Sequence, residues 1–184
     1  MHPSSNYITN EHDLIRGCID GVRKYQESMY GIYAGKMYSV CLRYCNNSDD
    51  AQDVLQDGFV KIFKNLEKFR GEGSFEGWVR RIFVNTAIEH YRKKANLISI
   101  SETVEVSRED DNFNSLDRLA EKDILNIIKK LSPGYRTVFN MYVIEGYSHK
   151  EIGELLNISE GTSKSQLARA KMILQKLVIE AKLT

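Results

Sequence analysis

The chain has 184 residues, 28% of them charged, and a formal net charge of +1 at pH 7. This length suits one large domain or two small ones, and the near-neutral total means that any nucleic-acid-binding surface has to be local. Three cysteines are too few for a disulfide framework and indicate a reducing compartment. The N-terminus carries no apolar secretory segment, and no stretch reaches the ~20 apolar residues of a membrane span. We therefore expect a cytoplasmic protein without membrane insertion.

The first half of the chain is periodic and rich in aromatic residues, which predicts several helices. Residues 12–46 are expected to be helical, although Gly31 and Gly35 leave the boundaries open. A second helix should follow the N-cap candidates at residues 47–50. Its apolar residues recur at spacings of three and four and share one face: Leu55, Phe59, Ile62, Phe63, Leu66 and Phe69. Gly58 should weaken this helix by about 1 kcal/mol relative to alanine, and the sequence offers no functional reason for it.

A loop at residues 69–74 separates this helix from a basic one. Gly71 and Gly73 should end the second helix, and Ser74 can cap the third. The third helix has an apolar side made by Phe75, Trp78, Val79, Ile82, Phe83 and Ala87. Its opposite side is predicted to carry Arg81, Asn85, Ile88 and Arg92, with Val84 and Tyr91 beside them.

Bases outnumber acids in the third helix and are interleaved with aromatic rings. Within residues 78–94, Glu89 is the single acid against Arg80, Arg81, Arg92, Lys93 and Lys94. Such a surface suits single-stranded DNA, because rings stack on unpaired bases while cations follow the phosphate backbone. The preceding loop could supply the pocket that an unstacked base requires. The alternative interpretation is that Trp78 and the phenylalanines simply form the core.

Residues 97–115 lose the helical periodicity and are strongly acidic. The single base Arg108 stands against Glu102, Glu105, Glu109, Asp110 and Asp111. This composition predicts a flexible acidic linker. A surface loop, or a short strand at residues 102–106, would fit the same composition.

Residues 116–184 are predicted to be helical again and to contain a helix-turn-helix. The helix ends are marked by Ser132 as an N-cap before Pro133, Gly146 as a stop, Ser148 with Glu151 as a capping box, Asn157 as a left-handed turn and Ser159 as the next N-cap. Gly161 is expected to allow a close backbone approach in the first turn of the last helix.

The last helix has two faces. Its buried side should be formed by Leu167, Ala170, Ile173, Leu174 and Leu177, and its outer side by Lys164, Ser165, Ala168 and Arg169. Basic and small polar side chains in that position can reach base edges and phosphates in a major groove. An ordinary helical hairpin with a solvated charged face is the alternative.

Three segments in this order resemble the extracytoplasmic-function (ECF) group of bacterial RNA polymerase sigma factors: residues 51–69, 73–94 and 131–171. The resemblance implies an all-α fold of two small helical domains, a promoter-melting bundle and a C-terminal helix-turn-helix domain. A flexible acidic linker would join them. The boundaries that it implies are residues 7–96, 97–116 and 117–184.

The resemblance also implies partners and sites. The protein would bind core RNA polymerase, at the clamp helices of the largest subunit and at the flap, through Asp53, Gln56 and Asp57. It would melt the minus-ten promoter element and hold its single strand with Phe69, Arg70, Gly71, Ser74, Arg81, Asn85, Tyr91 and Arg92. It would read the minus-thirty-five element as duplex with Thr162, Lys164, Ser165, Gln166 and Arg169. An anti-sigma factor is implied as a further partner.

Two positions depart from the family pattern. Ser163 stands where a β-branched apolar residue is usual, and its core-facing hydroxyl needs a partner such as a carbonyl one turn back. Gln166 stands where a basic residue is common, so one phosphate contact is lost and the sequence preference stays open.

Two other classes of protein have to be weighed. A conventional DNA-binding regulator would explain the helix-turn-helix but not the glycine loop and the second basic helix. An enzyme or metal protein would need a catalytic motif, or more ligands than Cys41, Cys45, His12, His90 and His149 provide. We therefore expect no catalytic residue, no metal and no cofactor.

Overall fold

The structure is a computed structural model that describes residues 10–98 and 125–182. The described residues contain helices and no strand, in agreement with the predicted all-α class of two helical domains. The N-terminal bundle consists of α1 (Glu11–Ile19), α2 (Arg23–Tyr44), α3 (Ser48–Asn65), the short 3-10 helix η1 (Leu66–Lys68) and α4 (Phe75–Ile98). The C-terminal unit contains a helical segment at residues 125–129, α6 (Pro133–Phe139), the π-helical turn η3 (Asn140–Ile144), α7 (His149–Leu156) and α8 (Glu160–Lys182). The predicted acidic linker lies almost entirely outside the described residues.

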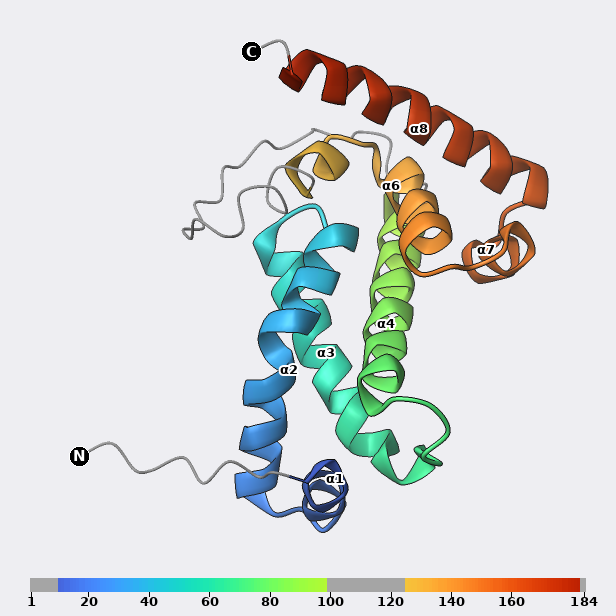
Figure 1. Ribbon diagram of the computed structural model, residues 1–184. Coiled ribbons are helices and arrows are strands. Elements are labelled where there is room, and N and C mark those ends of the chain that lie inside the picture. Colours follow the sequence, from blue (N-terminus) through green and yellow to red (C-terminus); the bar gives the residue numbers. More distant parts are fainter. Residues whose placement is uncertain (1–9, 99–124, 183–184) are drawn as a thin grey trace.

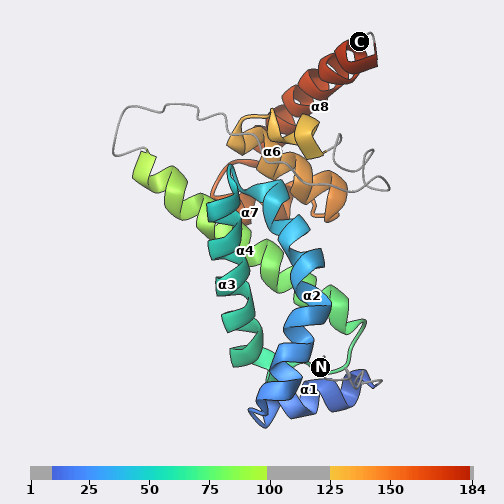
Figure 2. The ribbon, with the colours of Figure 1, turned by 90° about the vertical axis from the view of Figure 1, so that its left-hand side faces the viewer.

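The helices α2, α3 and α4 run alongside one another and α1 lies across one end of them (Figure 1). The C-terminal unit lies at the opposite end, as the view from the side also shows (Figure 2). There α6 contacts α2 and α7 contacts α4, so the two units share a contact. Helix α8 packs on α6 and α7 through its first half and then extends past them (Figure 1).

The helix expected over residues 12–46 is divided in two. Its break lies at Gly21, whose φ of 72° is the left-handed conformation that glycine adopts without strain. Gly31 and Gly35, which left the boundaries open, lie inside α2. The next helix begins as predicted, because the side chain of Asn47 accepts a hydrogen bond from Asp50 N at 2.7 Å.

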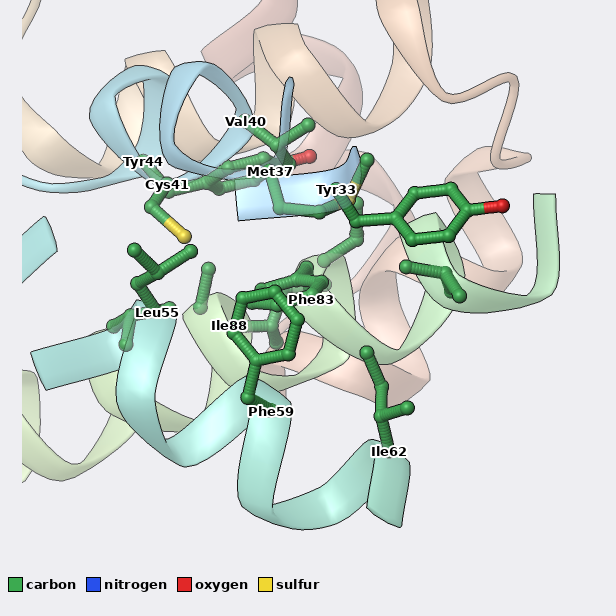
Figure 3. Packing of buried hydrophobic residues seen from close by; sticks show 14 of the residues in the cluster. Tyr33, Met37, Val40, Cys41, Tyr44, Leu55, Phe59, Ile62, Phe83 and Ile88 are labelled. Atoms are coloured by element: carbon green, nitrogen blue, oxygen red, sulfur yellow. The ribbon is translucent and has the colours of Figure 1, made fainter. Parts of the chain in front are cut away.

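The packing of α3 against α4 explains Gly58. A Cβ atom at residue 58 would lie 2.2 Å from Cε1 of Phe83, so any side chain there would collide with the ring. Phe83 is fully buried and meets Phe59 edge to face, with ring centroids 5.3 Å apart (Figure 3). The glycine lowers helix propensity but makes room for a large aromatic ring at the centre of the bundle.

One expectation for α4 was wrong. Ile88 was assigned to the outward side of the helix, but it is buried in the hydrophobic cluster that the bundle forms (Figure 3). Val84, expected beside that outward side, is buried too and lines a cavity shared with Tyr147 of the C-terminal unit. The assignment of faces from apolar spacing failed here because α4 is covered on two sides. A single apolar stripe along a helix predicts only one buried side.

The three cysteines are buried, and burial raises the pKa of the Cys18 thiol to about 11 and the pKa values of the Cys41 and Cys45 thiols to about 12. Because the thiolate is the reactive form, we predict that a thiol reagent such as Ellman's reagent modifies the native protein far more slowly than the denatured protein. In denaturant all three thiols should react promptly. Rapid labelling of any cysteine in the native state would contradict this burial.

Among the described residues, no helix is both long enough and apolar enough to cross a membrane. No group of three or more histidine, cysteine or acidic side chains in that part of the chain could hold a metal ion.

Candidate nucleic-acid interface

The helix-turn-helix forms with the predicted local chemistry. The carboxylate of Glu151 accepts hydrogen bonds from the backbone N and the Oγ of Ser148, at 2.8 and 2.7 Å. The backbone N of Glu151 in turn donates to Ser148 Oγ at 3.2 Å, which completes the capping box. The two hydrogen bonds that Ser148 donates to the Glu151 carboxylate lower the pKa of this group. At the turn, Asn157 adopts the left-handed conformation, with φ 55° and ψ 47°.

The close backbone approach in this motif lies at a different glycine from the one expected. A Cβ atom at Gly153 would lie 2.8 Å from the carbonyl oxygen of Ile158, which is backbone and cannot rotate away. At Gly161 the nearest atom is the Oγ of Ser159, at 3.7 Å, which is an ordinary contact. The tight angle between α7 and α8 therefore depends on Gly153.

The buried hydroxyl of Ser163 has an imidazole as its partner, not the carbonyl one turn back that was suggested. Ser163 is fully buried, and its Oγ lies 2.9 Å from Nδ1 of His149. The His149 ring stacks on Tyr142, with centroids 4.4 Å apart and planes inclined by 19°. A polar contact between the start of α7 and the first half of α8 thus replaces apolar packing at this position.

The residues expected to read duplex DNA share one end of α8 but differ in how freely they face solvent. Lys164, Ser165 and Arg169 are exposed, whereas Thr162 and Gln166 are half-buried. The Nζ of Lys164 pairs with Oε1 of Glu160 at 2.6 Å, and Nη1 of Arg169 donates to the hydroxyl of Tyr135 at 3.2 Å. Gln166 lies against α6, with Oε1 3.6 Å from the position of a Cβ at Gly134.

The loop expected to receive an unstacked base joins η1 to α4. Gly71 and Gly73 have φ values of 74° and 83°, which only glycine adopts readily. Ser74 Oγ accepts from the backbone N of Gly77 at 3.1 Å and so caps α4. Phe69 is half-buried, and its ring packs on Trp78 with centroids 5.6 Å apart, which agrees with the core interpretation of these rings. Arg70 is exposed beside them.

The remaining minus-ten candidates lie further along α4, and two of them face the C-terminal unit. Arg81 and Arg92 are exposed, but Asn85 and Tyr91 are half-buried. Asn85 Oδ1 accepts from the hydroxyl of Tyr147 at 3.5 Å. The Tyr91 hydroxyl lies 3.4 Å from the position of a Cβ at Gly134, and burial raises its pKa. The structure therefore separates this predicted set into an open group and a covered group.

The candidate polymerase contacts lie together on the outer face of α3. Asp53, Gln56 and Asp57 are all exposed. Val60, one turn further along the same face, is 49% exposed. Sequence periodicity did not single it out, because a lone apolar residue is common on protein surfaces.

The contact between the two units contains a charged cluster that the sequence did not predict. The side chain of Glu145, 7% exposed, accepts hydrogen bonds from Nε and Nη2 of Arg80 at 2.8 and 2.9 Å. The same carboxylate accepts from Nη2 of Arg43 at 3.4 Å. The bond with Glu145 raises the pKa of Arg80. These partners are far apart in the chain, so no local pattern connects them.

Next to this cluster, two side chains of the C-terminal unit cover the end of α2. Asn140 Nδ2 donates to the carbonyl oxygen of Arg43 at 2.7 Å. The guanidinium of Arg136 donates to the carbonyl of Tyr44 at 3.2 Å and to Oδ1 of Asn46. Both side chains are buried, and burial lowers the pKa of Arg136. They satisfy carbonyls that a helix terminus leaves without intrahelical donors.

Comparison with known proteins shows to which class of protein this chain belongs. Residues 29–96 match the family Sigma-70 region 2, and residues 121–174 match Sigma-70, region 4. The chain belongs to the sigma-70 family of RNA polymerase initiation factors. Within that family it is an ECF-type factor, and it directs promoter-specific initiation of transcription.

Two curated relatives illustrate this assignment. The chain is 28% identical to the ECF RNA polymerase sigma factor SigW of Bacillus subtilis, over 89% of this chain and 96% of the relative. It is 26% identical to the ECF RNA polymerase sigma-E factor of Haemophilus influenzae, over 88% and 92%. Among solved structures, the sigma factor RpoE in complex with the anti-sigma factor NepR from Bartonella quintana matches with a TM-score of 0.52. That match has 21% identity, covers 83% of this chain and 95% of the solved one, and shows the fold alone.

Proposed function

We propose that the two helical units bind one promoter, one unit its duplex DNA and the other its separated strand, while the protein is bound to core RNA polymerase. The C-terminal unit reads the minus-thirty-five element as duplex, and the N-terminal bundle opens and holds the minus-ten element. Domain boundaries at residues 7–96, 97–116 and 117–184 fit this division. The observation that carries the proposal is a capped helix-turn-helix with Lys164, Ser165 and Arg169 exposed, in the same chain as a basic helix that begins at a glycine loop.

Duplex recognition depends on the first half of α8. Its exposed cation and hydroxyl groups can donate to phosphates and base edges in a major groove. The hydrogen bond from Arg169 to the hydroxyl of Tyr135 ties the guanidinium to α6. Gln166 lies against α6, so we assign it a supporting role beside the three exposed residues.

Strand separation depends on the loop at residues 69–74 and on α4. Opening DNA costs on the order of 1–2 kcal/mol per base-pair step. Capture of an unstacked base by the loop, with Arg70 and Arg81 near the backbone, offsets part of this cost. Asn85, Tyr91 and Arg92 continue this path along the helix.

Core RNA polymerase is proposed to supply the catalysis that this chain does not perform. The exposed acids of α3 are proposed to bind the clamp helices, the C-terminal unit is proposed to meet the flap, and all catalysis belongs to the polymerase. We place this work in the cytoplasm, with no cofactor. An anti-sigma factor, as in the solved complex of RpoE with NepR, is proposed as a further partner.

Run-off transcription tests this function directly. Core RNA polymerase would be mixed with the purified protein and a promoter library, and discrete transcripts that require both proteins are expected. A conventional regulator would instead bind duplex sites without polymerase. Absence of any protein-dependent transcript from the native genome would refute the proposal.

Replacing Arg169 with alanine should weaken use of a cognate promoter by about tenfold, because one good contact to a base or phosphate is worth about 1–3 kcal/mol. Arg23→Ala is the matched control, since Arg23 makes one exposed contact, with Glu27 at 2.7 Å, at the far end of the bundle. Both variants lose one positive charge. Equal promoter use by the two variants, measured by run-off transcription, would remove Arg169 from the recognition surface.

A further inference from the structure

The start of helix α8 is held by a polar contact to which the proposed function gives no role. The Oγ of the fully buried Ser163 lies 2.9 Å from Nδ1 of His149, the first residue of α7. Ser163 stands between Thr162 and Lys164, two residues of the proposed duplex-reading set. The geometry of this contact therefore bears directly on where the reading residues lie.

The imidazole of His149 is itself held in a defined orientation. Its ring stacks on Tyr142 of η3, with centroids 4.4 Å apart and planes inclined by 19°. Stacking restricts rotation of the ring, so Nδ1 stays directed at the serine hydroxyl. The segments η3, α7 and α8 thus meet at one histidine, which connects the reading helix to the rest of the C-terminal unit.

The hydroxyl of Ser163 depends on this histidine for its hydrogen bond. The backbone N of Ser163 bonds to the carbonyl of Ser159 at 3.0 Å, but within the described residues the side-chain oxygen has Nδ1 as its one partner. A buried hydroxyl without a partner is costly, and a hydrogen bond weakens when its angle is distorted. The contact therefore favours one position of α8 on α7 and disfavours small rotations of the helix.

The protonation state of His149 decides whether the serine hydroxyl can donate. A neutral imidazole whose proton is on Nε2 accepts at Nδ1, whereas an imidazolium carries a proton on both nitrogens and accepts at neither. Protonation therefore removes the acceptor, and the buried hydroxyl of Ser163 has to turn away. Histidine is the residue whose ordinary titration falls between about pH 5 and pH 8. This ring is half-buried, so solvent can reach it.

Charged and titratable groups of both signs surround the imidazole. They come from η3, from α4, from α7 and from the first turns of α8: Tyr142, Arg81, Lys150, Glu151, Glu160 and Lys164. The pair with Lys164 lowers the pKa of the Glu160 carboxyl, and His149 and Lys150 add to this effect. Because the set mixes cations with acids, we attribute the effect argued here to the hydrogen bond with Ser163 and not to the surrounding charge.

We propose that His149 is a positioning residue for duplex recognition: its neutral form fixes the start of α8 through Ser163, and its protonation loosens this contact and weakens reading of the minus-thirty-five element. This inference rests on the proposed function, because it requires that the C-terminal unit reads duplex DNA. It adds a dependence of promoter choice on pH. The sign is distinctive, since a histidine that touched a DNA phosphate would strengthen binding when protonated.

Run-off transcription by core polymerase with the full-length protein tests the proposal, at about pH 8 and about pH 6. Each reaction contains two templates, a cognate promoter and the same promoter with a scrambled minus-thirty-five element. The ratio of the two transcripts cancels the pH dependence of the polymerase itself. With the original protein this ratio should fall by about threefold to tenfold at the lower pH, which is the effect of about one hydrogen bond.

Two variants remove the titrating contact in different ways. His149→Asn keeps an acceptor near the position of Nδ1 that does not titrate between these pH values, so the template ratio should stay close to the high-pH ratio of the original protein at both. Ser163→Ala removes the hydroxyl, so its ratio should not change with pH. The matched control is His12→Gln, which removes an exposed imidazole next to Asp13 in α1 and should keep the full pH dependence.

The role of His149 is overturned if the original protein, His149→Asn and Ser163→Ala share one pH dependence, or if the ratio of the original protein rises at the lower pH. Circular dichroism at both pH values shows which variants are folded. The two substitutions lie on different helices, so a folding defect in one leaves the other to decide. Absence of any factor-dependent transcript would refute the proposed function itself, whereas transcripts whose ratio is independent of pH refute only the role of His149.

Discussion

Replacing Phe83 with alanine should lower the free energy of unfolding by about 3–5 kcal/mol, because a fully buried ring leaves a cavity that the bundle cannot fill. Gly58→Ala should also destabilise the protein, by about 1–2 kcal/mol, although alanine favours helix formation. The new methyl group would lie 2.2 Å from the ring of Phe83. Urea unfolding of the purified variants measures both effects.

A double variant that combines Gly58→Ala with Phe83→Ala tests whether the two residues contact each other. With the ring removed, a methyl group at residue 58 fills space instead of colliding, so the double variant should be more stable than the sum of the two single effects by about 1–2 kcal/mol. Gly35→Ala is the control, since nothing lies within 4 Å of its Cβ position in the middle of α2. That variant should gain about 0.5–1 kcal/mol. Additive effects at Gly58 and Phe83 would show that the two helices do not meet there.

Gly153→Val should abolish promoter recognition by the C-terminal unit. The added side chain would press against the carbonyl of Ile158, and the backbone would have to move, which changes the angle of α8 to α7. We expect a loss of at least about 2 kcal/mol in stability of the C-terminal unit, from the cost typical of overpacking and strain. Run-off transcription should fall to the level of core polymerase without the factor.

Gly161→Val is the matched control for this change. It introduces the same side chain in the same motif, but its nearest neighbour is the Ser159 hydroxyl at 3.7 Å. Transcription should remain close to that of the original protein. If both valine variants behave alike, the tight approach at Gly153 does not determine the recognition geometry.

Local chemistry made much of the fold predictable. Asn47, Ser74 and Ser148 each cap a helix as expected, because a cap depends on residues no more than three positions away. Asn157 takes the left-handed turn for a reason that is equally local. The helix-turn-helix and the exposed outer face of α8 followed from these signals together with apolar spacing.

Features that depend on distant partners could not be predicted. Gly58 had no explanation until Phe83, from another helix, was placed over it. Ser163 was expected to bond to its own helix but meets His149. The partners Arg80 and Glu145 are 65 residues apart, and nothing in the neighbourhood of either one indicates the other. Which distant residues meet is determined by how the helices pack. The pattern of apolar residues indicates only which face of a helix is buried.

The π-helical turn η3 has a consequence for how this part of the chain tolerates insertions and deletions. Glu145 N bonds to the carbonyl of Asn140, five residues back, so this turn holds one residue more than an α-helical turn. Loss of one residue from it would rotate everything that follows by about 100° relative to α6. Asn140 would still reach α2, but Glu145 would point away from both of its arginines. The wide turn thus acts as a spacer whose length sets which charges can meet.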